Sequence, residues 1–208
     1  MVPLIATPEG SLTGRNKLAI VDLAYGNIGS IAFAFERLGC TPTVTADRHA
    51  LASASHIVLP GVGAAGFAMA RIEALGLAEP LAQATQPVLG ICLGMQLLYH
   101  RSEEDDTICL GLVPGTVRKL TSAPDRPVPH MGWSKLTVTD DGIGLDDGDY
   151  VYFAHSFACE DGPDSVATAD YGATIPAVVR HANFTGAQFH PERSGAAGAR
   201  FLQAFLNP

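Results

Sequence analysis

Cys92 stands where a catalytic cysteine is expected. It follows an apolar run, Val88 to Ile91, that reads as a buried strand, and Gly90 and Gly94 flank it before a helical-looking segment. Small residues at a sharp strand-to-helix turn allow a nucleophilic side chain to project from the bend. The free N–H groups at the start of the helix favour the thiolate, which is the nucleophilic form. An arbitrary buried cysteine, in contrast, is usually only a small apolar side chain.

A base and a carboxylate follow about a hundred residues later, in the segment Gly186 to Glu192. Cysteine catalysis needs a base within hydrogen-bond reach of the thiol, and usually a third group that orients the base. His190 would take the thiol proton and return it to the leaving group, and Glu192 would hold the imidazole in the required tautomer. Pro191 restricts His190 to an extended conformation. Cys92, His190 and Glu192 are therefore the candidate catalytic residues.

Both motifs resemble those of the triad-type (class I) glutamine amidotransferases. Four further segments narrow the resemblance to one subfamily, the glutaminase subunits of imidazole glycerol phosphate synthases in histidine biosynthesis. These segments are Gly26-Asn27-Ile28, Pro60-Gly61-Val62-Gly63, Pro129-His130-Met131-Gly132-Trp133 and Tyr152-Phe153-Ala154-His155-Ser156-Phe157. The resemblance covers residues from about Lys17 to Pro208, which is nearly the whole chain.

The resemblance implies an activity and a partner. The chain would hydrolyse glutamine to glutamate and ammonia without a cofactor, and would pass the ammonia to a cyclase subunit, a (β/α)8 barrel, within a heterodimer. The cyclase subunit would form imidazole glycerol phosphate and aminoimidazole carboxamide ribotide. The chain itself offers no candidate site for the large bis-phosphorylated substrate of that second reaction.

The glycine-rich segment after the expected strand Ile57 to Leu59 has two interpretations. From the residues alone it is an ordinary turn or a loop whose backbone N–H groups bind an anion. The resemblance implies the second, in which two N–H donors stabilise the tetrahedral oxyanion of amide hydrolysis. It also implies that the loop is misoriented until the partner and its ligand reposition it. The implied substrate-binding residues are Gly61, Val62, Gly63, Leu93, Gln96, Ser156 and Phe157.

Two polar side chains have competing interpretations. Gln96 lies one helical turn after Cys92 and on the same face. By chemistry alone it could equally cap a loop, whereas the resemblance implies that it holds the glutamine substrate. His155 is the rival to His190 as the base, but no carboxylate stands two residues after it.

An apolar set without evident chemistry is formed by Met131, Trp133 and Tyr152. These side chains could belong to the core, but aromatic residues and methionine are also enriched at interface cores. The resemblance implies that they face the cyclase subunit around the exit route of ammonia, and that Asn27 and Arg193 lie at the same interface.

The sequence departs from the subfamily pattern near the expected interface and substrate loops. Leu23 stands in place of a tyrosine, Ala24 of a glycine, Ser134 of an asparagine and Phe157 of a tyrosine. These departures bear on partner contacts more than on hydrolysis.

Composition excludes several other classes of function. The net charge of −8 argues against a nucleic-acid reader, which usually carries a basic face. No uninterrupted apolar stretch reaches ~18 residues, so we expect no membrane span. The four cysteines include no Cys-x-x-Cys pair, which favours a reducing cytoplasm. The seven histidines show no regular ligand spacing, which disfavours a metal site.

The hydrophobic pattern predicts a class I glutamine amidotransferase domain of the flavodoxin-like α/β type over residues 17–208, after a loose extension at 1–16. Strands at 18–23, 43–45, 57–59 and 88–91 alternate with helices at 28–38, 67–75 and 96–100, which indicates a mainly parallel sheet flanked by helices. Strands at 133–138, 150–158 and 177–180 suggest an antiparallel portion in the C-terminal half, and residues 196–206 a last helix.

Three alternatives remain open from the residues. The chain is another glutaminase subunit, feeding pyridoxal phosphate synthase or a sugar-aminating paralogue; a stand-alone cysteine hydrolase of similar fold; or a non-catalytic binding protein. The segment Pro129 to Trp133 argues against a subunit that feeds pyridoxal phosphate synthase, but it does not argue against a sugar-aminating paralogue. The apolar set argues for a docking face rather than a stand-alone hydrolase.

Overall fold

The computed structural model describes residues 17–207, so the expected extension at 1–16 lies outside the described residues. Within these described residues, nine strands form one sheet in the order β2-β1-β3-β4-β13-β12-β11-β8-β9. Its first five strands are mutually parallel: β2 (Thr43–Thr45), β1 (Leu18–Val21), β3 (His56–Leu59), β4 (Val88–Ile91) and β13 (Phe184–Ala187). The expected parallel sheet is confirmed.

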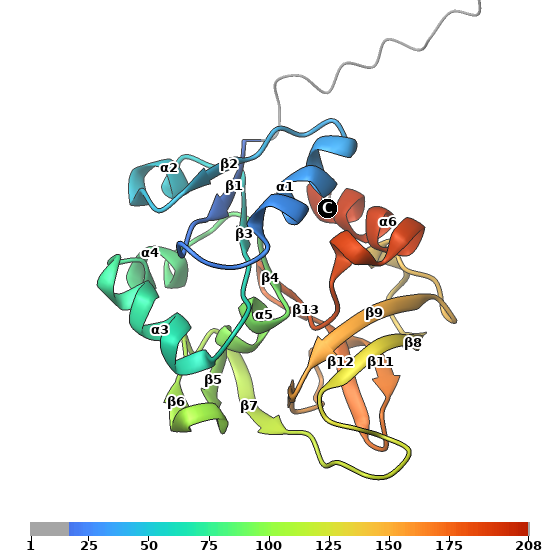
Figure 1. Cartoon of the computed structure of the whole chain (residues 1–208). Helices are drawn as coiled ribbons and strands as arrows, with labels where there is room; N and C mark the ends of the chain where they lie inside the picture. Colours follow the sequence, from blue (N-terminus) through green and yellow to red (C-terminus); the bar gives the residue numbers. More distant parts are fainter. Residues whose placement is uncertain (1–16, 208) are drawn as a thin grey trace, which may run out of the picture.

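Helices cover both faces of the parallel strands (Figure 1). Helices α1 (Ile28–Arg37) and α6 (Gly195–Leu206) pack on one face, and α2 (Arg48–Ala52), α3 (Ala65–Ala74) and α4 (Ala78–Ala82) on the other. Alternate residues of each strand point to opposite faces, so Ile20 joins the core under α1 and α6 while Val21 joins the core under α3. Both faces of β1 are therefore apolar, as is typical of a strand in a parallel sheet that helices cover on both sides.

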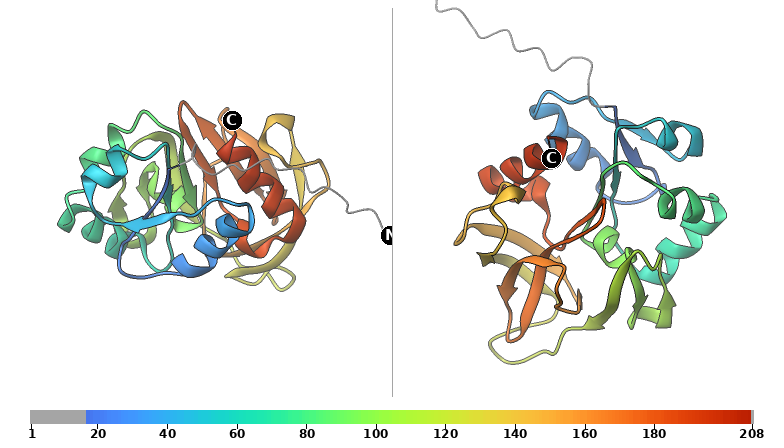
Figure 2. Two further views of the ribbon diagram at one scale, coloured as in Figure 1. Left: turned by 90° about the horizontal axis from the view of Figure 1, so that it is seen from above. Right: turned by 180° about the vertical axis from the view of Figure 1, so that it is seen from behind.

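The C-terminal half of the sheet is antiparallel, as expected. It contains β12 (Thr174–His181), β11 (Ser165–Asp170), β8 (His130–Val138) and β9 (Tyr150–His155). Strand β9 forms the edge of the sheet, at the end opposite α2, as the views in Figure 2 also show. The expected strand 150–158 is wrong at its C-terminal end, because β9 ends at His155 and the next strand, which begins at Phe157, belongs to a different sheet.

A second, four-stranded sheet was not expected. Its order is β10-β7-β5-β6, with β5 (Tyr99–Ser102), β6 (Thr107–Ile108), β7 (Val113–Lys119) and β10 (Phe157–Cys159). The expected helix at 96–100 is wrong: α5 (Leu93–Leu97) ends after five residues and β5 begins at Tyr99. The residues of β5 read Tyr-His-Arg-Ser, which is too short to show a helical or a strand period. Pairing with β7 makes them a strand. Short 3₁₀ helices complete the fold: η1 (Glu104–Asp106), η2 (Asp141–Ile143) and η3 (Pro191–Arg193).

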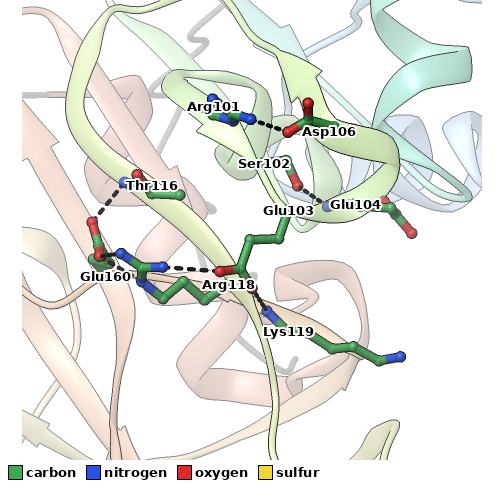
Figure 3. A network of polar contacts seen from close by, with 9 residues as sticks. All are labelled: Arg101, Ser102, Glu103, Glu104, Asp106, Thr116, Arg118, Lys119 and Glu160. Carbon is green, nitrogen blue, oxygen red and sulfur yellow. Dashed lines mark hydrogen bonds and ion pairs between the residues drawn. The ribbon is translucent and has the colours of Figure 1, made fainter.

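Polar contacts across the surface of the second sheet hold its strands together (Figure 3). Arg118 forms ion pairs with Glu103 at 2.9 Å and Glu160 at 2.5 Å. The same carboxylates accept the backbone N–H groups of Lys119 and Thr116. Each exposed pair contributes little to stability, but together they fix β7 beside the turn that leads into η1.

The departure at Ala24 has a conformational cost. Its φ of 63° lies in the left-handed region, where a side chain other than glycine costs about 1–2 kcal/mol. The side chain of Asp22 compensates in part, because its Oδ1 accepts the Ala24 N–H at 2.7 Å.

Candidate active site

The turn between β4 and α5 holds Cys92 in a strained backbone conformation. Its φ is 53° and its ψ is −111°. Such a conformation persists only where the packing around it holds the backbone in place. The packing is tight because glycines allow close backbone contact. A Cβ atom on Gly94 would lie 1.9 Å from the carbonyl oxygen of Leu59, and one on Gly90 would lie 2.6 Å from that of Gly94. The sharp strand-to-helix turn expected at Cys92 is therefore present.

The backbone of His190 is clamped between the edge strand β9 and η3. Its N–H donates to the carbonyl oxygen of Tyr152 at 2.9 Å. The hydroxyl of Ser194 donates to the His190 carbonyl oxygen at 2.7 Å and accepts the Tyr152 N–H at 3.0 Å. These bonds place the imidazole beside the Cys92 sulfur. Its Nδ1 lies 2.9 Å from Oε1 of Glu192, whose side chain is 1% exposed.

The electrostatics around His190 favour the imidazolium. Burial alone would lower the pKa of His190, but hydrogen bonds to Cys92 and Glu192 and the attraction of their charges raise it to about 10. A protonated imidazole next to the sulfur stabilises the thiolate. The three candidate catalytic side chains, expected from two distant motifs, thus lie in contact.

His155 has no ring nitrogen left for a substrate. Its Nδ1 lies 2.8 Å from the carbonyl oxygen of Phe157, an atom that only accepts, so Nδ1 carries the hydrogen. Its Nε2 lies 3.1 Å from Nδ1 of His130, whose Nε2 contacts the Ser134 hydroxyl at 2.9 Å. Burial lowers the pKa of His155 and of His130 to about 4, so both stay neutral. The geometry favours His190 as the base.

A cavity of about 400 Å³ opens beside the Cys92 sulfur, a volume typical of small-molecule sites. Most of the residues expected from the sequence line it: Asn27, Val62, Gly63, Cys92, Leu93, Gln96, Met131, Ser156, Phe157, His190 and Arg193. Gly61 lies beneath it, where a Cβ atom would meet the Gly94 nitrogen at 2.6 Å. The glycine-rich loop therefore packs directly on the first turn of α5.

The amide group of Gln96 is held by the protein itself. Its Nε2 donates to the carbonyl oxygen of Phe157 at 2.7 Å and to Oε1 of Gln188 at 2.9 Å. Both of its hydrogens are therefore used, and only Oε1 is left to contact a substrate in the cavity.

Glu104 in η1 also lines the cavity, and it lies outside every motif that the sequence offers. Its Oε2 accepts the N–H of Ala65 at 2.8 Å, just after the glycine-rich loop. A carboxylate at this position suits the α-ammonium group of an amino acid. The acidic run from Glu103 to Asp106 has the composition of a solvated loop, and no local pattern distinguishes the one carboxylate that faces the cavity.

The apolar set lies on the outer face of β8 and β9. Met131 is 64% exposed and Trp133 is 54% exposed, so the core interpretation of the tryptophan is wrong. Trp133 pairs with Tyr152 across the two strands, and the guanidinium of Arg193 lies 4.2 Å from the centre of the Tyr152 ring. Met131 and Arg193 also line the cavity, so this outer face meets the candidate catalytic side chains there.

Comparison with known proteins identifies relatives along most of the chain. Residues 19–207 match the family described as glutamine amidotransferase class-I. The chain is 48% identical over 192 residues to imidazole glycerol phosphate synthase subunit HisH of Xanthomonas campestris pv. campestris, covering 91% of this chain and 96% of the relative. It is 46% identical over 193 residues to the HisH subunit of Xylella fastidiosa, with the same coverage.

Solved structures share the fold at low sequence identity. A crystal structure of a glutamine amidotransferase superposes with a TM-score of 0.73 at 19% identity, covering 91% of this chain and 96% of that one. The structure of PurLQS from Thermotoga maritima gives 0.69 at 22% identity, covering 93% and 99%. None of the helices within residues 17–207 is long and apolar enough to cross a membrane.

Proposed function

The chain belongs to the class I glutamine amidotransferase family, and we propose that it is the glutaminase subunit of an imidazole glycerol phosphate synthase in histidine biosynthesis. One observation carries the chemistry: Cys92, His190 and Glu192 meet at a cavity that reaches an exposed apolar face. The near full-length similarity to HisH subunits supports the choice of pathway.

The reaction uses Cys92 and His190 in two steps. The thiolate attacks the side-chain amide carbon of glutamine, and His190 donates a proton to the departing ammonia as a γ-glutamyl thioester forms. His190 then takes a proton from water, the resulting hydroxide attacks the thioester, and glutamate leaves the regenerated thiol. Glu192 holds the Nδ1–H of His190 and stabilises the imidazolium. The three residues form a catalytic triad.

The cavity provides contacts for the rest of the substrate. The N–H of Leu93, at the first position of α5, has no partner inside the helix and is one oxyanion donor; the other comes from the Val62–Gly63 segment. Glu104 binds the α-ammonium group, and Oε1 of Gln96 accepts a further hydrogen bond from the substrate.

The ammonia leaves through the outer face of β8 and β9, where a cyclase subunit of the (β/α)8 type docks in a heterodimer. The exposed Met131 and Trp133 support this placement. Tyr152 and Arg193 lie at the same face, and Asn27 lines the cavity that opens there. In the assembled enzyme the cyclase subunit uses the ammonia in a lyase-type reaction, which cleaves its substrate and closes the imidazole ring. The four unbridged cysteines suit a cytoplasmic enzyme.

Coupling to the partner tests this proposal directly. We expect the isolated chain to hydrolyse glutamine slowly, because we infer that the oxyanion donor of the Val62–Gly63 segment reaches its working orientation only when the partner binds. Adding the cyclase subunit with its ribulose-phosphate ligand should raise the rate of glutamate release by ~10²–10³, the effect of one oxyanion donor. The cyclase subunit without the ligand is the control and should give a smaller rise. Full activity of the isolated chain would instead favour a stand-alone hydrolase.

Truncation of Trp133 tests the docking face. Trp133→Ala should weaken binding of the cyclase subunit by ~2 kcal/mol if the side chain is a central anchor. The melting temperature of the isolated chain should barely change, because the indole is half exposed. Isothermal titration and thermal unfolding measure the two effects. Ile108→Ala, which removes another exposed apolar side chain, from the second sheet, is the matched control. Unchanged affinity of Trp133→Ala would refute the docking face.

A further inference from the structure

The carbonyl oxygen of Phe157 determines how a buried chain of amides is oriented. A backbone carbonyl can only accept hydrogen bonds, so the Gln96 atom 2.7 Å away must be its nitrogen. The second hydrogen of that nitrogen points to Gln188 at 2.9 Å, so the Gln188 atom on that side must be its oxygen. The amide nitrogen of Gln188 is therefore on the other side.

That nitrogen faces the nucleophile. Nε2 of Gln188 lies 3.9 Å from the Cys92 sulfur, and the Gln188 side chain is 0% exposed. A buried amide N–H aimed at a sulfur stabilises the anion and not the thiol, because the anion is the stronger acceptor. The carbonyl oxygen of Ala154, also 3.9 Å from the sulfur, has the opposite effect, since it accepts a hydrogen bond from the thiol and repels the thiolate.

We propose that Gln188 is a further catalytic residue, whose side-chain N–H donates to the Cys92 sulfur and increases the fraction of thiolate. This inference rests on the proposed role of Cys92 as the nucleophile. Gln188 offsets the repulsion from Ala154 and supplements the attraction from His190. Gln96 acts through it, because its donated hydrogen bond prevents the Gln188 amide from turning its oxygen toward the sulfur.

Two substitutions of Gln188 distinguish the effect of its N–H donor from the effect of its side-chain shape. Gln188→Glu keeps the shape but replaces the donor with an oxygen, and Gln188→Met removes both polar atoms. The rate at which iodoacetamide alkylates Cys92, followed by peptide mass spectrometry across a pH series, reports the thiolate fraction. We expect the midpoint of this profile to rise by about one pH unit in Gln188→Met. It should rise further in Gln188→Glu.

A matched control is Gln86→Met. Gln86 is a part-buried glutamine whose amide donates to the backbone carbonyl of Leu51, and it lies away from the sulfur. Its profile should equal that of the unchanged chain. A wild-type midpoint in folded Gln188→Met would overturn the proposal. Failure of the proposed function would be visible separately, as absence of glutamine hydrolysis by the unchanged chain with its cyclase subunit.

A measurement on the native sequence keeps the proposal testable if both substitutions unfold the chain. The side-chain amide protons of Gln188, followed by nuclear magnetic resonance, should shift as the pH crosses the alkylation midpoint of Cys92. In Cys92→Ala the same resonances should not show that transition. A Gln188 amide that is insensitive to ionisation of the sulfur would refute the hydrogen bond.

Discussion

Replacing Cys92 with alanine is expected to abolish glutamine hydrolysis, with a loss of ~10⁴-fold or more, because removal of one member of a catalytic unit disables the whole unit. The fold should survive. Cys92 is small and nearly buried, and alanine removes only the sulfur while relieving none of the backbone strain. Glutamate release in the presence of the cyclase subunit measures the loss, and circular dichroism and co-purification with that subunit verify folding and docking.

Covalent labelling identifies the nucleophile independently of turnover. A glutamine analogue with an electrophilic side chain should modify Cys92 alone. Burial raises the pKa of the Cys109 thiol to about 11 and also raises the pKa values of Cys40 and Cys159, so these three cysteines remain unreactive thiols. Labelling at any of them, or residual turnover in Cys92→Ala, would contradict the assignment.

The sequence predicts the parallel part of the fold well because apolar strands and amphipathic helices leave separate signals. The strands at 43–45 and 88–91 agree with the structure to the residue, and α1 is found within one residue of its expected end. The second sheet leaves no such signal. Tyr99 to Ser102 reads Tyr-His-Arg-Ser, with three polar residues after the apolar Leu97 and Leu98. Only its pairing with β7, which lies further along the chain, makes it a strand.

The candidate site was predictable where a motif carries its chemistry in adjacent residues, as in the segment from Gln188 to Glu192. It was not predictable where the side chain depends on tertiary placement. Glu104 resembles its acidic neighbours, and only the packing of η1 against α3 brings it to the cavity. Gln188 belongs to a motif, but its role depends on an amide orientation set by Phe157.

Replacing His190 with alanine should cost almost as much activity as Cys92→Ala, since no other group can take its place. The elevated pKa of His190, about 10, reflects an imidazolium held between the sulfur and Glu192. Without it the sulfur loses its charge partner and the departing ammonia loses its proton donor. We expect a ~10⁴-fold loss in glutamate release. His181→Ala, which removes a histidine paired with Asp164 away from the cavity, is the matched control and should keep full activity.

Glu192→Gln separates orientation from charge within the same unit, and the loss should be smaller than in His190→Ala. The side-chain oxygen of the introduced glutamine can still accept the Nδ1–H of His190. The required tautomer of His190 therefore survives wherever the introduced amide turns its oxygen toward Nδ1. The negative charge that stabilises the imidazolium is lost in every molecule, and the pKa of His190 should fall. The pH dependence of glutamate release should therefore change in Glu192→Gln, which a purely structural role would not cause. Equal activity of His190→Ala and the unchanged chain would assign the proton transfers to solvent, because both nitrogens of His155 are already engaged.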